Sequence, residues 1–338
     1  MLFKGVIVGF GNVALKAHVP VWEENPHFTI GAVVEPDAER AGLAAKALPK
    51  ARLYADLAAV CDRGDIDFVD ICTPPSLHLD GILEACRAGL HVLCEKPLLP
   101  CMESLENVQQ TANRMQRVVF TVNNWKYAPI WQKVFELVHD NSIGAVRSVQ
   151  LSVLRPPNSG GGASDWRRCA ETAGGGILLD HGWHHLYLVR TIMRQSPLAV
   201  SAVMETAHDN GGIIEETVDL RLRFPSAEAS IYLTWKASRR LNHGTITGDK
   251  GVLRINDDHV ILTGRDAQDL RFDFSHPLSQ SSHHSDWMKP VVDDFYREIA
   301  GTGTAGANFT EAQQCAYLTS LAYQSHREGG RPVPIEWC

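Results

Sequence analysis

The feature that most constrains the fold is a glycine turn directly after a short apolar run near the start of the sequence. The apolar run covers residues 5–8, and Gly9, Gly11 and Ala14 follow with the spacing Gly-x-Gly-x-x-Ala. In a strand–turn–helix unit the first glycine permits the turn, the second lets the backbone approach a pyrophosphate, and a small third residue lets helix pack on strand. Free N–H groups at the helix start then bind the anion. Because ordinary tight turns share this spacing, the motif indicates a dinucleotide site only in combination with its surroundings.

Short apolar runs alternate with helical patterns over about the first 120 residues, which is typical of a parallel sheet with crossover helices. Strands are expected at 5–8, 29–34, 68–72, 91–94 and 118–122, and helices at 38–47 and 79–88. We therefore predict an α/β, Rossmann-type dinucleotide-binding domain over residues 1–123.

The pattern changes after an amphipathic stretch at residues 130–139. Strand-like alternation follows at 146–154, 199–205, 217–224, 229–236, 244–248 and 251–255, and helices are expected near 289–300 and 310–326. With no long helix between most of these strands, the expected sheet is mostly antiparallel. We predict an α+β domain for substrate and oligomer contacts over residues 124–338, with the C-terminal helix packing back toward the first domain. Residues 158–164 form a glycine-rich loop.

Composition and charge exclude several classes of protein. A length of 338 residues fits two domains, and 44% hydrophobic with 21% charged residues is ordinary for a globular enzyme. The formal net charge of -7 argues against nucleic acid or an anionic membrane as a partner. No apolar stretch reaches the roughly 18 residues of a membrane helix, and the first strand leaves no room for a signal peptide.

The eight cysteines are scattered and include no Cys-x-x-Cys pair. We interpret them as reduced thiols rather than as disulfides or a zinc site, and expect a cytoplasmic protein.

Glu35 ends the second expected strand, where an acidic residue would meet the adenosine ribose. A carboxylate there favours a free 2′-hydroxyl and repels a 2′-phosphate, so NAD is expected rather than NADP. Arg40, one helical turn beyond, could soften that preference and keeps NADP possible. The alternative for Glu35 is a solvated loop carboxylate.

Lys96 follows the expected strand at 91–94, in the sequence Glu95-Lys96-Pro97. The turn that begins at Thr73 follows the preceding strand in the same way. Ligands in open α/β sheets bind at the carboxyl ends of the strands. Most lysines are solvated, but the placement of Lys96 predicts a role beside the nicotinamide.

Asp180 and His184 follow a run of three glycines and are four residues apart, so on a helix they would share a face. A carboxylate beside an imidazole is a common acid–base arrangement, because histidine titrates near neutral pH. The alternatives are a structural carboxylate with a core histidine, or a metal site through His181, His184 and His185. The latter lacks a further ligand motif, so we expect no metal. We interpret His283 and His284 as part of a solvated turn.

In their order and spacing these motifs resemble the glucose–fructose oxidoreductase / inositol dehydrogenase family, often written Gfo/Idh/MocA. The resemblance runs almost end to end. It rests on the turn with His18-Val19-Pro20, on Thr73-Pro74-Pro75 with His78, on Glu95-Lys96-Pro97, on residues 124–129, on 174–176 with Asp180 and His184, and on 248–251.

The resemblance implies that Lys96, Asp180 and His184 form the catalytic group. His184 would take the proton of the reacting hydroxyl, Lys96 would stabilise the negative charge on its oxygen, and Asp180 would orient the substrate or His184. It also implies an open second-domain sheet used for dimer or tetramer contacts, and a cis bond before Pro97. The residues expected to contact the cofactor are Gly9, Phe10, Gly11, Asn12, Val13, Glu35, Thr73, Pro74, His78, Glu95 and Lys96.

Two residues depart from the family pattern as it is usually met. Lys126 stands where many relatives carry arginine, and Tyr187 stands where many carry aspartate. Both are expected near the substrate, so the substrate can differ from simple inositol or glucose.

Other substrate contacts follow from residue type. Flat tryptophan faces suit a sugar ring, although core packing explains a single tryptophan equally well. Arginines beside the glycine-rich loop suit an anionic group, although loop arginines are often solvated. The candidates are Trp125, Trp166, Trp183, Arg155, Arg167 and Arg168.

The expected function is an NAD(P)-dependent oxidoreductase that transfers a hydride between the nicotinamide and a secondary alcohol or ketone of a sugar, cyclitol or derivative. One alternative is an NAD-dependent glycosidase that uses transient oxidation. Another is a non-catalytic dinucleotide-binding sensor on the same fold.

Overall fold

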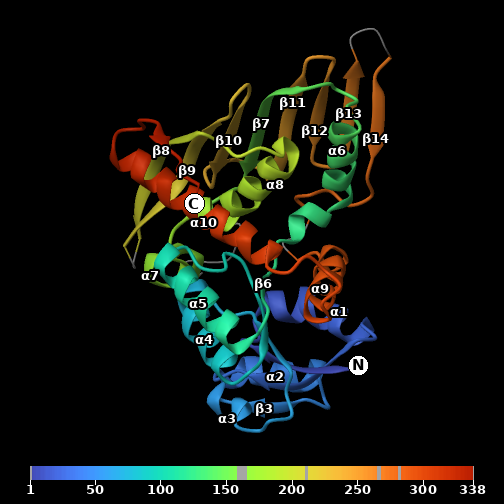
Figure 1. Cartoon of the computed structure of the whole chain (residues 1–338), viewed down its shortest axis with the longest axis vertical. Coiled ribbons are helices and arrows are strands. Elements are labelled where there is room, and N and C mark those ends of the chain that lie inside the picture. The colour runs from blue at the N-terminus through green and yellow to red at the C-terminus, as the bar shows by residue number, and fades with distance from the viewer. Residues whose placement is uncertain (1, 158–165, 210–211, 265–267, 281–282, 338) are drawn as a thin grey trace. The chain divides into compact units, whose positions relative to one another are not determined.

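The computed structural model describes residues 2–157, 166–209, 212–264, 268–280 and 283–337 (Figure 1). The chain divides into two compact units: unit 1 comprises Met1–Asn124 and His283–Gln314, and unit 2 comprises Trp125–Ser282 and Cys315–Cys338. The assignment of functions to residues 1–123 and 124–338 remains a prediction. The glycine-rich loop at 158–164 lies outside the described residues.

Within the described residues, unit 1 has a six-stranded parallel sheet in the order β3-β2-β1-β4-β5-β6. The strands are β1 (Phe3–Val8), β2 (Phe28–Val34), β3 (Arg52–Tyr54), β4 (Phe68–Ile71), β5 (His91–Cys94) and β6 (Val119–Thr121). The strand order reverses between β1 and β4, which is where ligands bind in doubly wound sheets. The predicted Rossmann-type fold is confirmed. Strand β3, which is short and largely exposed, was not predicted.

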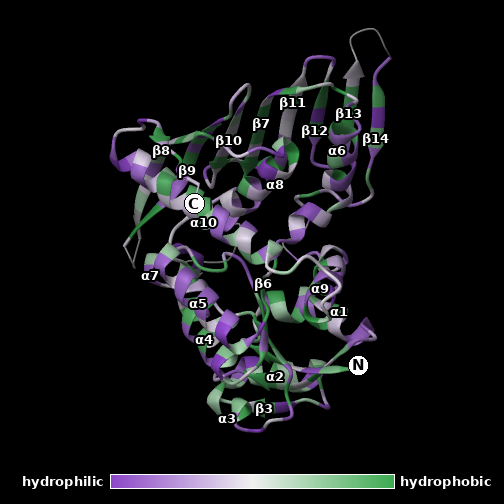
Figure 2. Ribbon diagram, viewed as in Figure 1, coloured by the Kyte–Doolittle hydropathy of each residue, from purple (hydrophilic) through white to green (hydrophobic). Residues whose placement is uncertain are grey.

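Two short helical segments of unit 1 follow the turns that were predicted to bind the dinucleotide. A π-helix, η1 (Ala14–His18), follows the glycine turn and leads into α1 (Val19–Glu24), and a 3₁₀ turn, η2 (Pro75–Leu77), precedes α4. The remaining helices are α2 (Ala38–Ala47), α3 (Ala58–Cys61), α4 (His78–Arg87), α5 (Met102–Met115) and α9 (Ser285–Ile299). Figure 2 shows that α5 alternates between hydrophobic and hydrophilic residues, as expected of a helix on the surface of a sheet.

An aromatic cluster joins α9 to the sheet of unit 1. Phe295 lies 5.8 Å from Phe28 and 6.0 Å from Phe68, measured between ring centroids. This packing explains why residues 283–314 belong to unit 1. The interpretation of His283 and His284 as a solvated turn is wrong for His284, which is buried and stacks on Trp287.

The described part of unit 2 contains a nine-stranded sheet in the order β14-β13-β12-β11-β7-β10-β9-β8-β15. Among its pairs β7 and β10 are parallel and the others antiparallel, which confirms the predicted mostly antiparallel sheet. The strands are β7 (Val146–Leu154), β8 (Ala199–Asp209), β9 (Gly212–Arg223), β10 (Glu228–Thr234), β11 (Leu241–Gly248), β12 (Gly251–Asn256), β13 (His259–Gly264), β14 (Leu270–Asp273) and β15 (Val333–Pro334).

Helices cover one face of this sheet, where α6 and α8 lie side by side in Figure 1. Side chains alternate between buried and exposed along β9 and β10, because successive residues of a strand point to opposite faces. The helical elements are η3 (Asn124–Tyr127), α6 (Pro129–His139), η4 (Trp166–Arg168), α7 (Ala170–Ala173), η5 (Leu178–Gly182), α8 (Trp183–Met193) and α10 (Ala307–Arg327). Asn124 and the first part of α10, up to Gln314, belong to unit 1.

The structure bears on two expectations from the sequence, the lack of a membrane helix and the reduced state of the cysteines. In the described ranges, no helix is both long enough and apolar enough to cross a membrane. The described cysteines, Cys61, Cys72, Cys86, Cys94, Cys101, Cys169 and Cys315, are all free thiols.

Candidate active site

The glycine turn after β1 has the geometry of a cradle for an anion. Gly9 has φ +85°, and a Cβ there would lie 2.9 Å from the Thr73 side chain, so glycine is required. A Cβ on Gly11 would meet nothing within 4 Å, so open space lies beside this part of the backbone. Ala14 is fully buried where the helix packs on the sheet. The backbone at Gly11 therefore leaves room for a pyrophosphate, whereas Gly9 and Ala14 are packed closely against other protein atoms.

Glu35 is buried and braces this turn from the end of β2. One carboxylate oxygen accepts a hydrogen bond from the Phe10 N–H at 2.7 Å, and the other accepts from the Asp37 N–H at 3.0 Å. Asp37 in turn caps α2 by accepting from the Arg40 N–H. The alternative of a solvated carboxylate is therefore wrong, and the expected contact of Glu35 with the ribose stays a prediction.

The turn after β4 offers a second polar group for a ligand. The Thr73 hydroxyl is buried and has no hydrogen-bond partner among the described residues, and its side chain borders Gly9. Buried hydroxyls are normally paired, so an unpaired one beside the turn fits a bound dinucleotide. The residues present thus fit the expected cofactor.

His78 joins this turn to the loop after β5. It is fully buried, with Nε2 3.0 Å from the Thr73 carbonyl and Nδ1 3.0 Å from the Pro97 carbonyl. Burial lowers the pKa of His78 despite these carbonyl contacts. Its effect on a cofactor would therefore act through the two loops that it holds.

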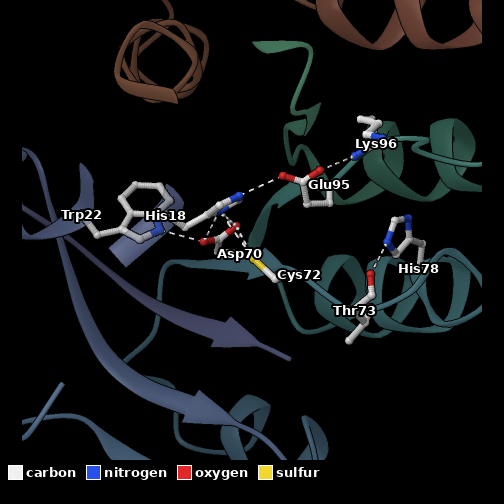
Figure 3. Close-up of polar contacts among 8 residues, drawn as sticks. All are labelled: His18, Trp22, Asp70, Cys72, Thr73, His78, Glu95 and Lys96. Atoms are coloured by element: carbon white, nitrogen blue, oxygen red, sulfur yellow. Dashed lines mark hydrogen bonds and ion pairs between the residues drawn. The ribbon is translucent and has the colours of Figure 1, made fainter. Parts of the chain in front are cut away.

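Lys96 lies at the carboxyl end of β5, as predicted, and the Lys96–Pro97 peptide bond is cis, which confirms that prediction. Glu95 accepts a hydrogen bond from the Lys96 N–H at 3.1 Å through one oxygen. Its other oxygen lies 2.9 Å from His18 Nε2 (Figure 3). No role was predicted for His18 or for Asp70, which contacts the other ring nitrogen of His18. A charged residue inside the apolar run of β4 was the signal that could have found them.

The segment with Asp180 and His184 is helical, but it is not one continuous α-helix. Residues Leu178–Gly182 form a π-helix, and α8 begins at Trp183. A π-turn has a longer hydrogen-bond period than an α-turn, so the spacing of four residues does not by itself place Asp180 and His184 on one face. Asp180 Oδ2 lies 3.5 Å from His181 Nε2.

Two glycines and a buried carboxylate fix where this helix begins. A Cβ on Gly176 would lie 2.1 Å from the Glu215 carbonyl oxygen, and one on Gly182 would lie 2.6 Å from Leu178. The Glu215 carboxylate accepts from the N–H groups of Gly176 and Leu178 and from the Tyr323 hydroxyl. Helix packing therefore explains the glycine at position 182.

His184 is held by a tyrosine and a tryptophan. Its Nδ1 lies 2.7 Å from the Tyr187 hydroxyl, which also accepts a hydrogen bond from the Trp125 N–H at 3.1 Å. The Trp125 ring stacks on His184 with centroids 4.9 Å apart and planes at 16°. Tyr187 is fully buried and contacts His184, and its expected place near the substrate stays a prediction.

The alternative of a histidine metal site is not supported by the neighbouring contacts. His185 Nδ1 lies 2.9 Å from the His181 carbonyl, and burial lowers the pKa of His185 to about 4. Among the residues that the structure describes, the group close enough to hold a metal is instead His18, Asp70 and Cys72.

The predicted substrate residues have different surroundings. Trp183 is fully buried, which favours its core-packing alternative, and Trp125 is buried against His184. The Arg167 guanidinium stacks on Trp166 at 4.4 Å, and Lys126 Nζ lies 5.6 Å from the centre of the Tyr127 ring. Their contacts with a substrate stay predictions.

Two arginines have protein partners. Arg155 is buried and donates to the Leu154 carbonyl and to Asn242, and burial lowers its pKa to about 10. Arg168 lies 3.3 Å from Glu216. Arg155 therefore contributes to the protein interior, contrary to its suggested contact with an anionic substrate.

Comparison with known families places an N-terminal and a central segment of the chain in one family. Residues 3–123 match the family model described as "Oxidoreductase family, NAD-binding Rossmann fold". Residues 131–254 match the model described as "GFO/IDH/MocA C-terminal domain".

Named relatives include sugar dehydrogenases and reductases. The chain is 24% identical to levoglucosan dehydrogenase of Pseudarthrobacter phenanthrenivorans over 87% of its length and 86% of that protein. It is 30% identical to dTDP-3,4-didehydro-2,6-dideoxy-alpha-D-glucose 3-reductase of Streptomyces violaceoruber over 60% of its length and 57% of that protein.

Solved structures share the fold. A levoglucosan dehydrogenase in complex with NADH and levoglucosan superimposes with a TM-score of 0.86 at 22% identity, covering 100% of both chains. An aldose-aldose oxidoreductase from Caulobacter crescentus, complexed with glycerol, gives 0.85 at 23% identity over 99% of this chain and 100% of that one.

Replacing Gly11 by alanine tests the cradle. The added methyl group would enter the open space beside the backbone, so we expect the Kd for NAD to rise about tenfold or more, which is about 1.4 kcal/mol. The free energy of unfolding should stay within about 0.5 kcal/mol of the unmodified protein. Calorimetric titration with NAD and urea unfolding measure the two quantities.

Gly9→Ala is the matched control for this experiment. Its positive φ and its contact with Thr73 predict a loss of about 1–3 kcal/mol in the free energy of unfolding. Unchanged NAD affinity in Gly11→Ala would contradict the assignment of the cradle.

Proposed function

Because the chain belongs to the Gfo/Idh/MocA family of NAD-binding oxidoreductases, we propose that it transfers a hydride between the nicotinamide and a secondary alcohol or ketone of a sugar, cyclitol or related polyol. The observation that carries this proposal is the way His184 is anchored. One ring nitrogen meets Tyr187, and Trp125 covers one face of the ring, so the imidazole is held in one orientation. Histidine is suited to proton transfer because it titrates near neutral pH.

We propose the tautomer of His184 in which Nδ1 carries the proton. The Tyr187 oxygen accepts from the Trp125 N–H and has a second lone pair for a His184 Nδ1–H donor. In that tautomer His184 Nε2 carries a lone pair and acts as the general base toward the substrate hydroxyl. We propose that Tyr187 selects this tautomer and stabilises the ring after it takes the proton.

Lys96 has the complementary role in this proposal. NAD, when bound, supplies the acceptor for the hydride. The Lys96 ammonium stabilises the substrate oxygen as its proton passes to His184, because a nearby cation lowers the energy of developing negative charge. Asp180 orients the substrate or the histidine. Gly9, Gly11 and Thr73 hold the dinucleotide at the carboxyl edge of the sheet.

We propose a polyhydroxylated substrate because named relatives act on sugars and nucleotide sugars. Trp166, Arg167 and Lys126 are the candidates for contacts that select it.

The proposed homodimer or homotetramer would use the exposed face of the unit 2 sheet. Val203 and Tyr232 are 58% and 42% exposed, and both pair with Asp219 of β9 in the strand register, so they share one row on this face. Exposed apolar residues in a row on a flat sheet are a suitable contact surface.

A screen for cofactor reduction tests the proposed reaction. With NAD present we expect net NADH formation with at least one sugar, inositol, sugar acid or nucleotide sugar, measured by NADH absorbance. Turnover of a glycoside without net NADH would indicate the glycosidase instead. Binding of NAD without turnover of any of these compounds would indicate the sensor.

His184→Ala is expected to lower kcat by about 10²–10⁴-fold, the usual contribution of a general base. The Kd for NAD should be unchanged, because the cradle lies in unit 1. His259→Ala is the control, since His259 bonds to Asp258 at the β12–β13 turn. Near-normal turnover in His184→Ala would remove His184 from the mechanism.

Tyr187→Phe is expected to lower kcat roughly 10–100-fold through misorientation of the His184 ring. Loss of the partner of the Trp125 N–H should also cost about 1–3 kcal/mol of stability. Tyr317→Phe is the matched control, because Tyr317 contacts Trp337 edge-on. If both variants keep the same kcat, Tyr187 has no role in positioning the base.

A further inference from the structure

A buried network of ionisable groups in unit 1 lies behind Lys96 (Figure 3). His18 is at its centre, with Nδ1 2.9 and 3.0 Å from the two Asp70 oxygens and Nε2 2.9 Å from Glu95. His18 and Asp70 are fully buried, and the Glu95 side chain is 14% exposed. We call His18, Asp70 and Glu95 the histidine bridge.

Counting protons identifies the charge state of the bridge. Both ring nitrogens of His18 face carboxylate oxygens, and ionised carboxylates only accept hydrogen bonds. A neutral imidazole has one N–H and would set a lone pair against one of these carboxylates. An imidazolium donates from both nitrogens and satisfies both partners, as charge-assisted bonds do.

Both carboxylates also accept a hydrogen bond from a further donor. Asp70 also accepts from Trp22 Nε1 at 2.7 Å, and Glu95 accepts from the Lys96 N–H at 3.1 Å. Each of these bonds favours the charged form of its acceptor. The proton is therefore best placed on His18, between two carboxylates.

The pKa directions agree with this geometry. Burial by itself lowers the pKa of His18, but Asp70 and Cys72 together outweigh burial and raise this pKa well above its ordinary value. For Glu95, burial raises the pKa, but the bond to His18 outweighs it and leaves the pKa below its ordinary value.

A metal ion held by His18, Asp70 and Cys72 is the competing interpretation, because their ligand atoms lie close together. The geometry favours hydrogen bonds. His18 Nδ1 is nearly equidistant from both Asp70 oxygens, as expected of an N–H that points between them. Burial raises the pKa of the Cys72 thiol to about 12, so in the metal-free protein this group is protonated.

The bridge joins three segments that meet at the carboxyl edge of the sheet. His18 ends η1, the helix that follows the glycine turn. Asp70 belongs to β4, and Glu95 directly precedes Lys96. A movement of Lys96 relative to the turn would therefore stretch a buried, charge-assisted hydrogen bond.

We propose that His18 is a positioning residue which, as a buried imidazolium, bridges Asp70 and Glu95 and so holds the Lys96 loop in register with the glycine turn. The inference rests on the proposed function, because it takes Lys96 to act on the substrate. The protonation of the bridge itself can be observed without any turnover.

The first experiment reads that protonation state. In full-length protein with ¹⁵N-labelled histidines, we expect one ring to keep both N–H protons at about pH 8, well above the ordinary histidine pKa of about 6.5. The signal should disappear in His18→Gln. In Asp70→Asn the ring should lose its second proton at this pH, because the charge that retains it is gone. A neutral His18 at about pH 8 in the unmodified protein would overturn the proposal.

The second experiment reads the positioning role. His18→Gln should lower kcat about 10–100-fold through displacement of Lys96, while the Kd for NAD changes less than about threefold. His27→Gln makes the same chemical change in unit 1 at a ring that stacks on Tyr296, and should keep the kcat of the unmodified protein. Unchanged kcat in folded His18→Gln would overturn the positioning role.

Glu95→Gln provides a second route if His18→Gln does not fold. It removes the charge on one side of the bridge and keeps the shape, and kcat should again fall with the Kd for NAD nearly unchanged. Normal kcat in this variant would equally overturn the proposal. If His18 is doubly protonated and His184→Ala retains full activity, the proposed mechanism fails while the bridge stands.

The pH dependence of stability has a defined sign. Because the pKa of His18 is raised on folding, its contribution is fully present below about pH 6.5. It is lost as the pH rises through the raised pKa. The difference in unfolding free energy between the unmodified protein and His18→Gln should therefore be larger at about pH 6 than in alkaline solution.

Other charged groups around the bridge can also contribute to this pH profile. Cys72 and Lys96 face it, and α9 packs against η1. The titratable residues of α9 are Asp286, Lys289, Asp293, Asp294, Tyr296, Arg297 and Glu298. Asp70→Asn, measured at the same pH values, isolates the part due to the bridge, and an identical pH profile in this variant would contradict the assignment.

Discussion

A charged histidine inside unit 1 organises the carboxyl edge of the parallel sheet. Burying an ion costs several kcal/mol unless close partners of opposite charge offset the loss of water. For His18 those partners are Asp70 and Glu95, on both sides of the ring. Because they come from different strands, the charge is satisfied only when the glycine-turn helix, β4 and the end of β5 lie in register. The position of Lys96 thus depends on a buried interaction among His18, Asp70 and Glu95.

In unit 2, a different set of buried hydrogen bonds positions His184. Gly176 allows the chain to approach the backbone of β9, and the Glu215 carboxylate accepts the first N–H groups of the helix. Tyr187 then holds the imidazole from the next turn. In both units the proposed catalytic side chain is supported by buried polar contacts, which limits its freedom before substrate binds.

Apolar runs in a sequence predict strands and helices, but they do not predict the hydrogen-bond register within a helix. Apolar runs in the sequence identified the main strands of both sheets, but not β3, β13, β14 or β15, which lie at or next to the edges of their sheets. Residues Leu178–Gly182 were expected to be α-helical, because the difference between an α- and a π-turn lies in hydrogen-bond register and not in composition.

The sequence by itself determined the two sheet types, the glycine turn and the family, because each depends on residues that are close along the chain or on motif order. The cis bond before Pro97 followed from the family resemblance. Only the tertiary structure decided which groups support them. His18 meets partners 52 and 77 residues away, and Tyr187 meets Trp125 across 62 residues. Such contacts have no period in the sequence. They exist because folding brings distant strands and helices together and leaves buried polar atoms to find one another.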